Sequence, residues 1–332
     1  MSRSSALGRE TAPGLSAVTV FNRDVGSQSV IHSGADRLNH ARLARPAAFS
    51  LLVYASRAMD DLIARIERAR SSKAAVLITG ETGVGKELIA RAVHAISSRR
   101  EREFIPFNCG GAPPELIASE LFGYRKGAFT GADRDRKGVI REANRCALFL
   151  DEIGELPLAA QVMLLRFLQE GEVRPLGEVR PIKVDVRVIA ATNRDLEAEV
   201  EAGRFRDDLF ERLNVLRLHI PPLRERREDI LPLIEYFLDL YQRREGKQGL
   251  RLSGEALALM LGYDWPRNVR ELSNVMLRLV AFAENGEVIG PERVLKEIGA
   301  GVCAPPRADA VVEGKVAINH NLPLHEAIEE LK

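Results

Sequence analysis

The sequence predicts an α/β fold, in which helices cover both faces of a parallel sheet as three layers, followed by a small all-helical domain. Three observations support this prediction. Short apolar runs typical of buried strands alternate with segments of helical periodicity. A glycine-rich segment joins the first such run to a helix. After Pro221 and Pro222 the strand pattern stops, and only helical patterns follow.

The composition is that of a soluble globular chain. It has 332 residues, with 48 Lys and Arg against 47 Asp and Glu, so the formal net charge of +1 gives no global attraction to nucleic acid or membranes. With 45% hydrophobic residues, the chain can bury one good-sized core and a smaller second one, which excludes wholesale disorder. The longest apolar stretch, residues 256–261, is far shorter than the roughly 18 residues of a membrane span, and the polar N-terminus lacks a signal-peptide core. We therefore expect a cytoplasmic protein without membrane contact.

The three cysteines, Cys109, Cys146 and Cys303, are widely separated and form no CxxC motif. This spacing argues against a zinc site and against a disulfide framework. We expect reduced thiols that serve only in packing, as in a reducing compartment.

Changes of pattern divide the chain into four segments. Residues 1–49 carry scattered Ser, Gly and Arg, with a strand-like patch only at 18–21, and are expected to form a weakly ordered arm. Residues 50–222 form the α/β segment, and residues 223–298 form the helical one. Residues 299–332 begin as a linker and end on Leu324, Ile328 and Leu331, which share one helical face. We expect there an amphipathic helix that is truncated where the sequence stops.

Each element in these segments has its own signal. Met59, Leu62, Ile63 and Ile66 recur at helical spacing and predict the first helix. Apolar runs predict strands at 75–79, 146–150 and 184–190, and helical patterns between and after them cover 88–96, 158–169 and 205–213. In the helical segment, the patterns cover 229–242, 254–261 and 268–283.

The glycine-rich segment has the sequence and context of a phosphate-binding loop. It follows a buried strand, precedes a helix, and consists of Gly80, Glu81, Thr82, Gly83, Val84, Gly85, Lys86 and Glu87. Glycines allow backbone N–H groups to surround phosphates, and Lys86 reaches the terminal phosphates of ATP. Glu87 stands where a Ser or Thr hydroxyl normally coordinates Mg²⁺, so the metal depends on another acid. The alternative is a glycine-rich turn with a surface lysine.

Asp151 and Glu152 supply that acid. They follow the apolar run 146–150, at the carboxyl edge of a predicted parallel strand, where such sheets bind ligands. We assign Asp151 to the Mg²⁺ shell and Glu152 to polarising the attacking water. A solvated acidic turn is the alternative.

A third strand ends on Thr192 and Asn193, whose polar groups can bond the attacking water or the terminal phosphate. Downstream, Arg206 and Arg212 flank an apolar and acidic helix. Their spacing alone favours surface salt bridges over stabilisation of transition-state charge.

The most specific segment is 120–132, with the sequence ELFGYRKGAFTGA. Through this segment and the loops above, residues 51–296 resemble the AAA+ domain of bacterial sigma-54-dependent transcription activators, the NtrC-class enhancer-binding proteins. The resemblance implies a P-loop AAA+ fold with a helical lid. It also implies that a GAFTGA loop contacts sigma-54 through Gly127, Ala128, Phe129, Thr130, Gly131 and Ala132. A glycine-rich turn with Phe129 buried is the alternative.

The resemblance also implies roles for single residues. In this family Glu commonly follows the P-loop lysine, so Glu87 is expected. Asn108 would restrain Glu152 in one state of the cycle, and Asn193 would be the first sensor. Arg206 and Arg212 would act as arginine fingers on the neighbouring subunit's ATP. In the segment WPRNVREL, 265–272, Arg270 would be the second sensor and Trp265 a core residue, and Arg267 replaces the usual Gly.

Arginine fingers acting between subunits imply a homo-oligomeric ring, a hexamer, which hydrolyses ATP with Mg²⁺. By resemblance, the ring would remodel the closed promoter complex of sigma-54 RNA polymerase holoenzyme. A receiver domain and a helix-turn-helix are not evident, so DNA contact is assigned to no residue. Two alternatives remain: an AAA+ remodeller of another protein, and a regulatory ring subunit without its own turnover.

Overall fold

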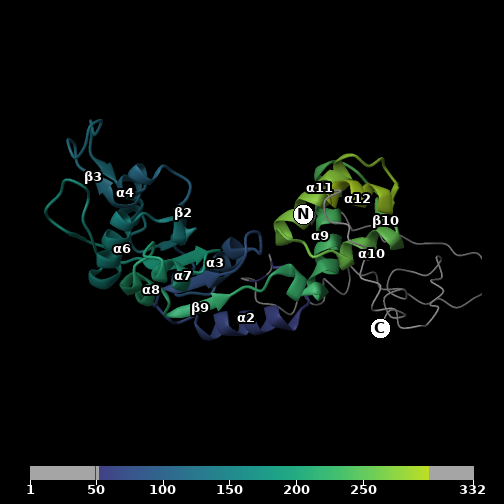
Figure 1. Cartoon of the computed structure of the whole chain (residues 1–332), viewed down its shortest axis with the longest axis horizontal. Helices are drawn as coiled ribbons and strands as arrows, with labels where there is room; N and C mark the ends of the chain where they lie inside the picture. Colours follow the sequence, from purple (N-terminus) through teal and green to yellow (C-terminus); the bar gives the residue numbers. More distant parts are fainter. Residues whose placement is uncertain (1–48, 50–51, 299–332) are drawn as a thin grey trace, which may run out of the picture.

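The computed structural model describes Phe49 and residues 52–298 of the chain. Cys303, the strand-like patch at 18–21 and the expected helix around Leu324 lie outside these residues. Figure 1 shows an α/β body beside a smaller helical body. No helix in the described range is long and apolar enough to cross a membrane.

A five-stranded parallel sheet forms the centre of the α/β body, in the order β2–β5–β8–β1–β9. The strands are β1 (Val76–Thr79), β2 (Phe104–Asn108), β5 (Ala147–Asp151), β8 (Arg187–Thr192) and β9 (Leu216–His219). The predicted parallel sheet is confirmed. Because all five strands run the same way, the residues that follow them gather at one edge.

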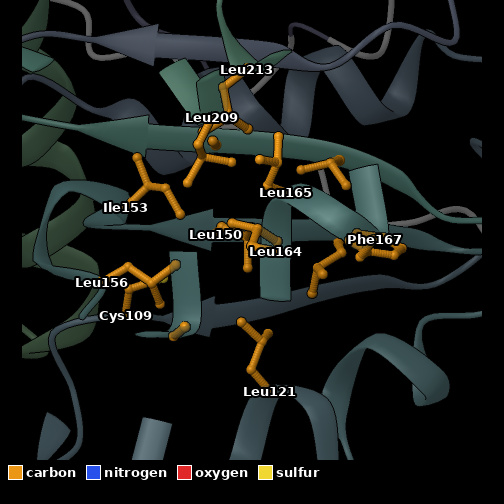
Figure 2. Close-up of a cluster of buried hydrophobic side chains, with 14 of the residues drawn as sticks. Cys109, Leu121, Leu150, Ile153, Leu156, Leu164, Leu165, Phe167, Leu209 and Leu213 are labelled. Atoms are coloured by element: carbon orange, nitrogen blue, oxygen red, sulfur yellow. The ribbon is translucent and has the colours of Figure 1, made fainter. Parts of the chain in front are cut away.

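Alternate residues of each strand point to opposite faces of the sheet, so each face buries its own hydrophobic cluster. Val76 and Ile78 pack with α2 (Arg57–Arg68) and α3 (Lys86–Ala95), and Phe49 joins this cluster. Leu77 and Leu150 face the other layer. That layer consists of α4 (Pro114–Phe122), α5 (Val139–Glu142), α6 (Leu158–Glu170), α7 (Leu196–Glu201) and α8 (Asp207–Leu213). Figure 2 shows part of this second cluster. The fold is therefore the expected three-layer α/β/α arrangement.

The two edge strands, β2 and β9, have no signal in our sequence analysis. Their residues are mostly half-buried or exposed, whereas β5 and β8 are buried almost throughout. An edge strand needs no continuous apolar run, and it tolerates Pro106, which lacks a backbone N–H. Several predicted boundaries also differ by one to three residues, and three of them illustrate this. β8 begins at Arg187 rather than 184, α8 begins at Asp207 rather than 205, and the helix expected over 268–283 ends at Ala281.

The helical body follows directly after β9. Two 3-10 turns, η3 (Leu223–Glu225) and η4 (Arg227–Asp229), lead into its helices, α9 (Ile230–Arg244), α10 (Gly254–Gly262), α11 (Asn268–Ala281) and α12 (Pro291–Ile298). Short strands β10 (Arg251–Leu252) and β11 (Val288–Ile289) join its loops. Trp265 is completely buried in its separate core, and its indole N–H donates to the carbonyl of Met260 at 3.0 Å. The predicted core position of Trp265 is confirmed.

Two short antiparallel hairpins leave the α/β body. In one, β3 (Gly123–Tyr124) pairs with β4 (Arg136–Lys137), and in the other β6 (Glu172–Val173) pairs with β7 (Ile182–Lys183). The β3–β4 hairpin follows α4 without a break and lies at the end of the molecule far from the helical body (Figure 1).

Candidate functional site

The loop between β1 and α3 has a backbone that requires glycine. Gly83 has φ +82°, and a Cβ built there would lie 2.3 Å from the carbonyl oxygen of Arg267. Gly85, at φ +104°, is left-handed and directly precedes the first residue of α3, Lys86. The backbone N–H groups at the start of α3 therefore open toward the loop, as a phosphate requires.

Lys86 reaches back across this loop. Its Nζ donates to the carbonyl oxygens of Gly80 at 2.8 Å and Glu81 at 3.0 Å. Burial lowers the pKa of Lys86, and the charges of Asp151 and Glu152 oppose that shift. The lysine thus lies between the loop and the two acids that end β5.

Asp151 and Glu152 occupy different environments. Burial raises the pKa of Asp151, although the N–H of Glu152, which donates to Asp151 Oδ1 at 2.9 Å, and the charge of Lys86 counteract it. Glu152 has φ +54°, a left-handed conformation that is uncommon for residues other than glycine and costs free energy. Their neighbours Leu150 and Ile153 are buried in the cluster of Figure 2, which anchors the turn from beneath.

The two asparagines lie on either side of this acidic turn. Asn108 pairs with Asp151 in the sheet register, and its side-chain oxygen accepts the N–H of Gly110 at 2.7 Å. Glu152 Oε2 is also close to Gly110, since a Cβ built there would lie 2.6 Å from it. Asn193 follows β8 and donates through Nδ2 to Thr82 Oγ1 at 3.1 Å. Both asparagines therefore lie beside the acids or the phosphate loop.

The helical body closes over the loop through α11. The N–H of Arg270 donates to the carbonyl of Gly83 at 3.2 Å. Asn268 is completely buried and donates through Nδ2 to Glu81 Oε2 at 3.0 Å and to the Thr82 carbonyl at 3.1 Å. The guanidinium of Arg224 donates to both carboxylate oxygens of Glu81, at 2.6 and 2.9 Å. The hydrogen bonds from Arg224 and Asn268 lower the pKa of Glu81 to about 2.

A cleft of about 290 Å³ lies between the two bodies at this point. The polar residues that line it include Thr82, Lys86, Glu87, Asp151, Glu152, Asn193, Arg270 and Ser273, and Val269 and Phe237 add apolar surface. The structure therefore brings most of the residues predicted to bind or hydrolyse ATP into one site. Val84 is buried below the loop, and Glu87 pairs with Arg91 at 2.7 Å.

The donor set suits a magnesium ion carried by a nucleotide. Asp151 is the carboxylate at the end of β5, and no group of three or more possible metal ligands occurs among the described residues. Mg²⁺ bound with phosphates typically takes only one or two protein carboxylates and keeps several waters. One acid beside a phosphate loop therefore fits such an ion, whereas a cage built of protein ligands alone is not formed there.

Arg206 and Arg212 do not line this cleft of their own chain. Arg206 precedes α8 and forms a two-bond ion pair with Asp208 at 2.6 and 2.9 Å. Arg212 donates to the carbonyl of Leu168 at 3.0 and 3.2 Å. Both side chains are exposed, so they are accessible to another subunit.

The segment 127–132 forms the tip of the β3–β4 hairpin. Phe129 is 40% exposed and packs edge-on against Tyr124, with ring centroids 4.9 Å apart. Thr130 is exposed, whereas Ala132 is buried and closes the loop by accepting the N–H of Gly127 at 2.9 Å. Arg125 joins the hairpin base to the β6–β7 loop through Glu178 at 2.8 Å. The alternative in which Phe129 is buried is excluded.

Sequence reasoning missed the partners that attach the helical body to the loop, namely Arg224 and Asn268. Both lie more than 140 positions from Glu81, and no local pattern pairs either residue with Glu81, although Asn268 belongs to the segment 265–272. The unusual buried amide of Asn268, in a left-handed conformation at φ +56°, became evident only in the structure.

Comparisons with known proteins agree with this geometry. Residues 52–219 match the Sigma-54 interaction domain family, and residues 224–308 match the AAA+ ATPase lid domain family. The chain is 45% identical over 290 residues to the transcriptional regulatory protein ZraR of Klebsiella oxytoca, covering 86% of this chain and 66% of that protein. It is 48% identical over 248 residues to the regulatory protein AtoC of Escherichia coli K12, covering 75% and 54%. The chain therefore spans between half and two thirds of the length of these relatives.

Among solved structures, the chain is similar to NtrX from Brucella abortus, crystallised in complex with ATP. The TM-score is 0.70 at 34% sequence identity, covering 89% of this chain and 63% of that one. A crystal structure of the same NtrX in complex with ADP gives a TM-score of 0.69 at 32% identity.

Proposed function

Because the chain belongs to the family of sigma-54-dependent transcription activators that carry the Sigma-54 interaction domain, we propose that it hydrolyses ATP to remodel the closed promoter complex of sigma-54 RNA polymerase. The observation that carries this proposal is the connection between two sites of one chain. Asn108, beside the acidic turn, leads within a few residues into α4, and α4 continues without a break into the β3–β4 hairpin. A change at the phosphate site can therefore reach the hairpin through the turn 109–113 and α4.

ATP binding uses the loop and the cleft. The backbone N–H groups before α3 and the ammonium of Lys86 hold the phosphates, and Arg270 adds a charge from the helical body. Lys86 would then exchange its bonds to the Gly80 and Glu81 carbonyls for phosphate oxygens. Asp151 would hold Mg²⁺, which neutralises the charge that develops on the phosphates.

Hydrolysis requires a base and a sensor. Glu152, which lines the cleft, would accept a proton from the attacking water. Asn193, now bonded to Thr82, lies close enough to the loop to bond the terminal phosphate or the water instead. Asn108 would hold Glu152 away from the water before activation, since both side chains lie near Gly110.

Phosphate contacts would then set the position of the hairpin that presents Phe129 and Thr130. Exposed aromatic and hydroxyl groups on a tip with glycine on both sides can contact a partner while the backbone rearranges. Sigma-54 is the partner that the family implies. The tip would engage it with ATP bound and release it after hydrolysis, as two-state elements biased by a terminal phosphate do.

The arginines outside the cleft support a ring as the working form. Arg206 and Arg212 would complete the site of the next subunit, as arginine fingers supplied in trans do. Lys86→Ala chains and Arg206→Ala/Arg212→Ala chains should each be inactive, and a mixture of the two should recover part of the ATPase rate. Activity should return at those subunit boundaries where the intact loop of an Arg206→Ala/Arg212→Ala chain faces the intact arginines of a Lys86→Ala chain. Failure of the mixture to recover, in chains that do associate, would contradict fingers acting in trans.

The function itself is tested by open-complex formation. Purified chain, sigma-54 holoenzyme and a sigma-54 promoter on supercoiled DNA should give heparin-resistant open complexes with ATP and none with ADP. Open complexes that never form, in a chain that assembles and hydrolyses ATP, would favour remodelling of another protein. A chain that assembles without measurable turnover would instead favour a regulatory ring subunit.

A further inference from the structure

A second cavity lies at the edge of the sheet opposite the nucleotide cleft. It has a volume of about 150 Å³, and its lining includes Val76, Arg187 and Leu216, the first residues of β1, β8 and β9. Arg65 from α2 and Arg217 also line it. Because the strands are parallel, their amino ends define the edge away from the carboxyl ends that hold the phosphate loop. This cavity, which we name the arginine pocket, is therefore separate from the proposed ATP site.

Arg187, which lines this pocket, has a buried guanidinium with unused hydrogen-bonding capacity. The residue is only 3% exposed, and its Nε and Nη1 have no hydrogen-bond partner within the described part of the chain. None of the ion pairs among the described residues involves Arg187. Arginine stays charged in proteins, and burying an unpaired charge is costly.

The acidic groups near the pocket are already engaged by other arginines. Glu197 pairs with Arg217 at 2.7 Å, and Asp185 pairs with Arg99, the arginine whose charge acts on Arg187. Arg65 donates to the Arg217 carbonyl at 2.8 Å and forms no ion pair with a described residue. The pocket therefore carries an excess of positive charge.

The positive charge of Arg187 also acts on a histidine, His94 of α3. His94 is buried, and its Nδ1 has no partner among the described residues. Burial lowers the pKa of His94, and the charges of Arg187 and Arg91 lower it further. The surroundings of Arg187 thus favour a bound anion and disfavour a further positive charge.

We propose that the arginine pocket binds one small oxyanion of the size and chemistry of inorganic phosphate. Arg187 supplies a guanidinium whose charge has no ion-pair partner among the described residues, and hydrogen bonds between ionised groups are stronger than those between neutral ones. Arg65 supplies a second charge at the mouth of the pocket. Neither the proposed hydrolysis nor the hairpin uses these residues, so the site is a second anion site on the same chain.

Thermal unfolding of the full chain tests this proposal. The chain is first saturated with a non-hydrolysable ATP analogue and Mg²⁺, so that the terminal-phosphate position at the β1–α3 loop is filled and added phosphate does not act there. Melting is then compared in phosphate and in chloride at equal ionic strength. We expect phosphate to raise the melting temperature of the wild type in a saturable way, and to have no such effect on Arg187→Met. Arg243→Met, at an exposed arginine of α9, is the matched control and should respond like the wild type.

The comparison in chloride adds a prediction of opposite sign. Without an oxyanion, Arg187→Met removes an unpaired buried charge, so this variant should melt at or above the temperature of the wild type. In phosphate the order should reverse. A wild type that responds equally to phosphate and chloride, or an Arg187→Met variant that keeps the phosphate response, would overturn the proposal.

A binding measurement covers the case in which Arg187→Met does not fold. Equilibrium dialysis of wild-type chain, saturated with the same ATP analogue, against labelled phosphate should show one bound equivalent. The exposed substitution Arg65→Gln should weaken that binding several-fold. Absence of bound phosphate, or equal binding by Arg65→Gln, would exclude the arginine pocket as the site.

Discussion

Glu152 combines a strained backbone with a carboxylate at the end of β5, beside Lys86 and opposite Asn108. Left-handed conformations of residues other than glycine cluster at functional sites, because they aim a side chain where a relaxed turn does not. Asp151, one residue earlier, is held on the strand and half-buried. Two adjacent acids thus have different surroundings, which fits one metal ligand and one base.

Replacing Glu152 by Gln should separate binding from turnover. The amide keeps the shape of the side chain and loses the base, so ATP should still bind while the hydrolysis rate falls about 10²- to 10⁴-fold. Nucleotide retention on a filter and phosphate release measure the two effects. Glu170→Gln, at an exposed residue of α6, serves as the control. Loss of ATP binding in Glu152→Gln would show that this residue holds nucleotide rather than activating water.

Glu81 makes stability depend on pH. Its bonds to Arg224 and Asn268 lower its pKa from 4.5 to about 2, so the folded chain binds that proton less tightly than the unfolded chain. The stabilisation is therefore complete above about pH 4.5 and is lost as the pH falls toward 2. Because the carboxylate is 41% exposed, solvent screening limits its contribution to about 1 kcal/mol or less.

Urea unfolding of Glu81→Gln and the wild type checks this sign. The variant should be less stable at pH 7, and the difference should shrink as the pH is lowered below 4.5. Glu245→Gln, at an exposed glutamate that makes no ion pair with a described residue, should show no such trend. If the difference in unfolding free energy between Glu81→Gln and the wild type grew as the pH fell, the lowered pKa of Glu81 would be contradicted.

At the scale of elements, the β3–β4 hairpin is held at its base, whereas the two glycines of its tip have open surroundings. Leu176 of the β6–β7 loop accepts the N–H of Arg125 at 3.0 Å and donates to the Gly123 carbonyl at 2.9 Å. Gly177 approaches Ala128 so closely that a Cβ there would lie 2.9 Å from the Ala128 Cβ. Gly127 and Gly131 have nothing within 4 Å of such a Cβ. The backbone at Gly127 and Gly131 therefore has room to rearrange, whereas the hairpin base and Ala128 contact the second hairpin.

Thr130→Ala should uncouple the two activities of the chain. The hydroxyl is exposed at the tip and remote from the cleft, so ATP hydrolysis should be nearly unchanged. Open-complex formation should fall at least about tenfold, a loss of about 1.4 kcal/mol of partner contact. Ser71→Ala, at an exposed site after α2, is the control. Equal loss of hydrolysis and activation would show that Thr130 acts inside the ATPase cycle.

The elements that the sequence predicted are those with strong local signals. Helices α2, α3 and α6 and the central strands β1 and β5 lie at or near their predicted positions, because a buried face imposes apolar periodicity. The edge strands β2 and β9 escaped detection because one side of each meets no neighbouring strand in the sheet. The position of β8 shifted because Val184 and Val186 are only partly buried against the core, although their apolar side chains resemble strand residues.

At the scale of the whole molecule, Asp229 ties three segments together. It is completely buried and accepts the backbone N–H groups of Ala55 at 2.6 Å and Ser56 at 2.7 Å, before α2. It also faces Arg226 at 3.4 Å, and Arg226 donates to the Val84 carbonyl in the phosphate loop at 3.0 Å. The N-terminal segment, the loop and the start of the helical body therefore share one buried ion pair.

Asp229→Ala should destabilise the fold by about 3–5 kcal/mol, because it leaves Arg226 buried without its partner. Urea unfolding followed by circular dichroism measures the loss. Asp239→Ala removes an exposed pair with Arg243 in α9 and should change stability little. If both variants unfold at the same urea concentration as the wild type, the Asp229 network does not hold the two bodies together.

The sequence by itself determined what depends on neighbours along the chain. Strand and helix alternation, the glycine geometry from Gly80 to Gly85, the acids that end β5 and the 127–132 tip all have local causes. Only the tertiary structure decided which distant groups meet. The bonds of Glu81 to Arg224 and Asn268 span 143 and 187 positions, and the unpaired charge of Arg187 depends on which acids its neighbours have taken. Such pairings are set by the packing of whole layers, and no periodicity of the chain carries them.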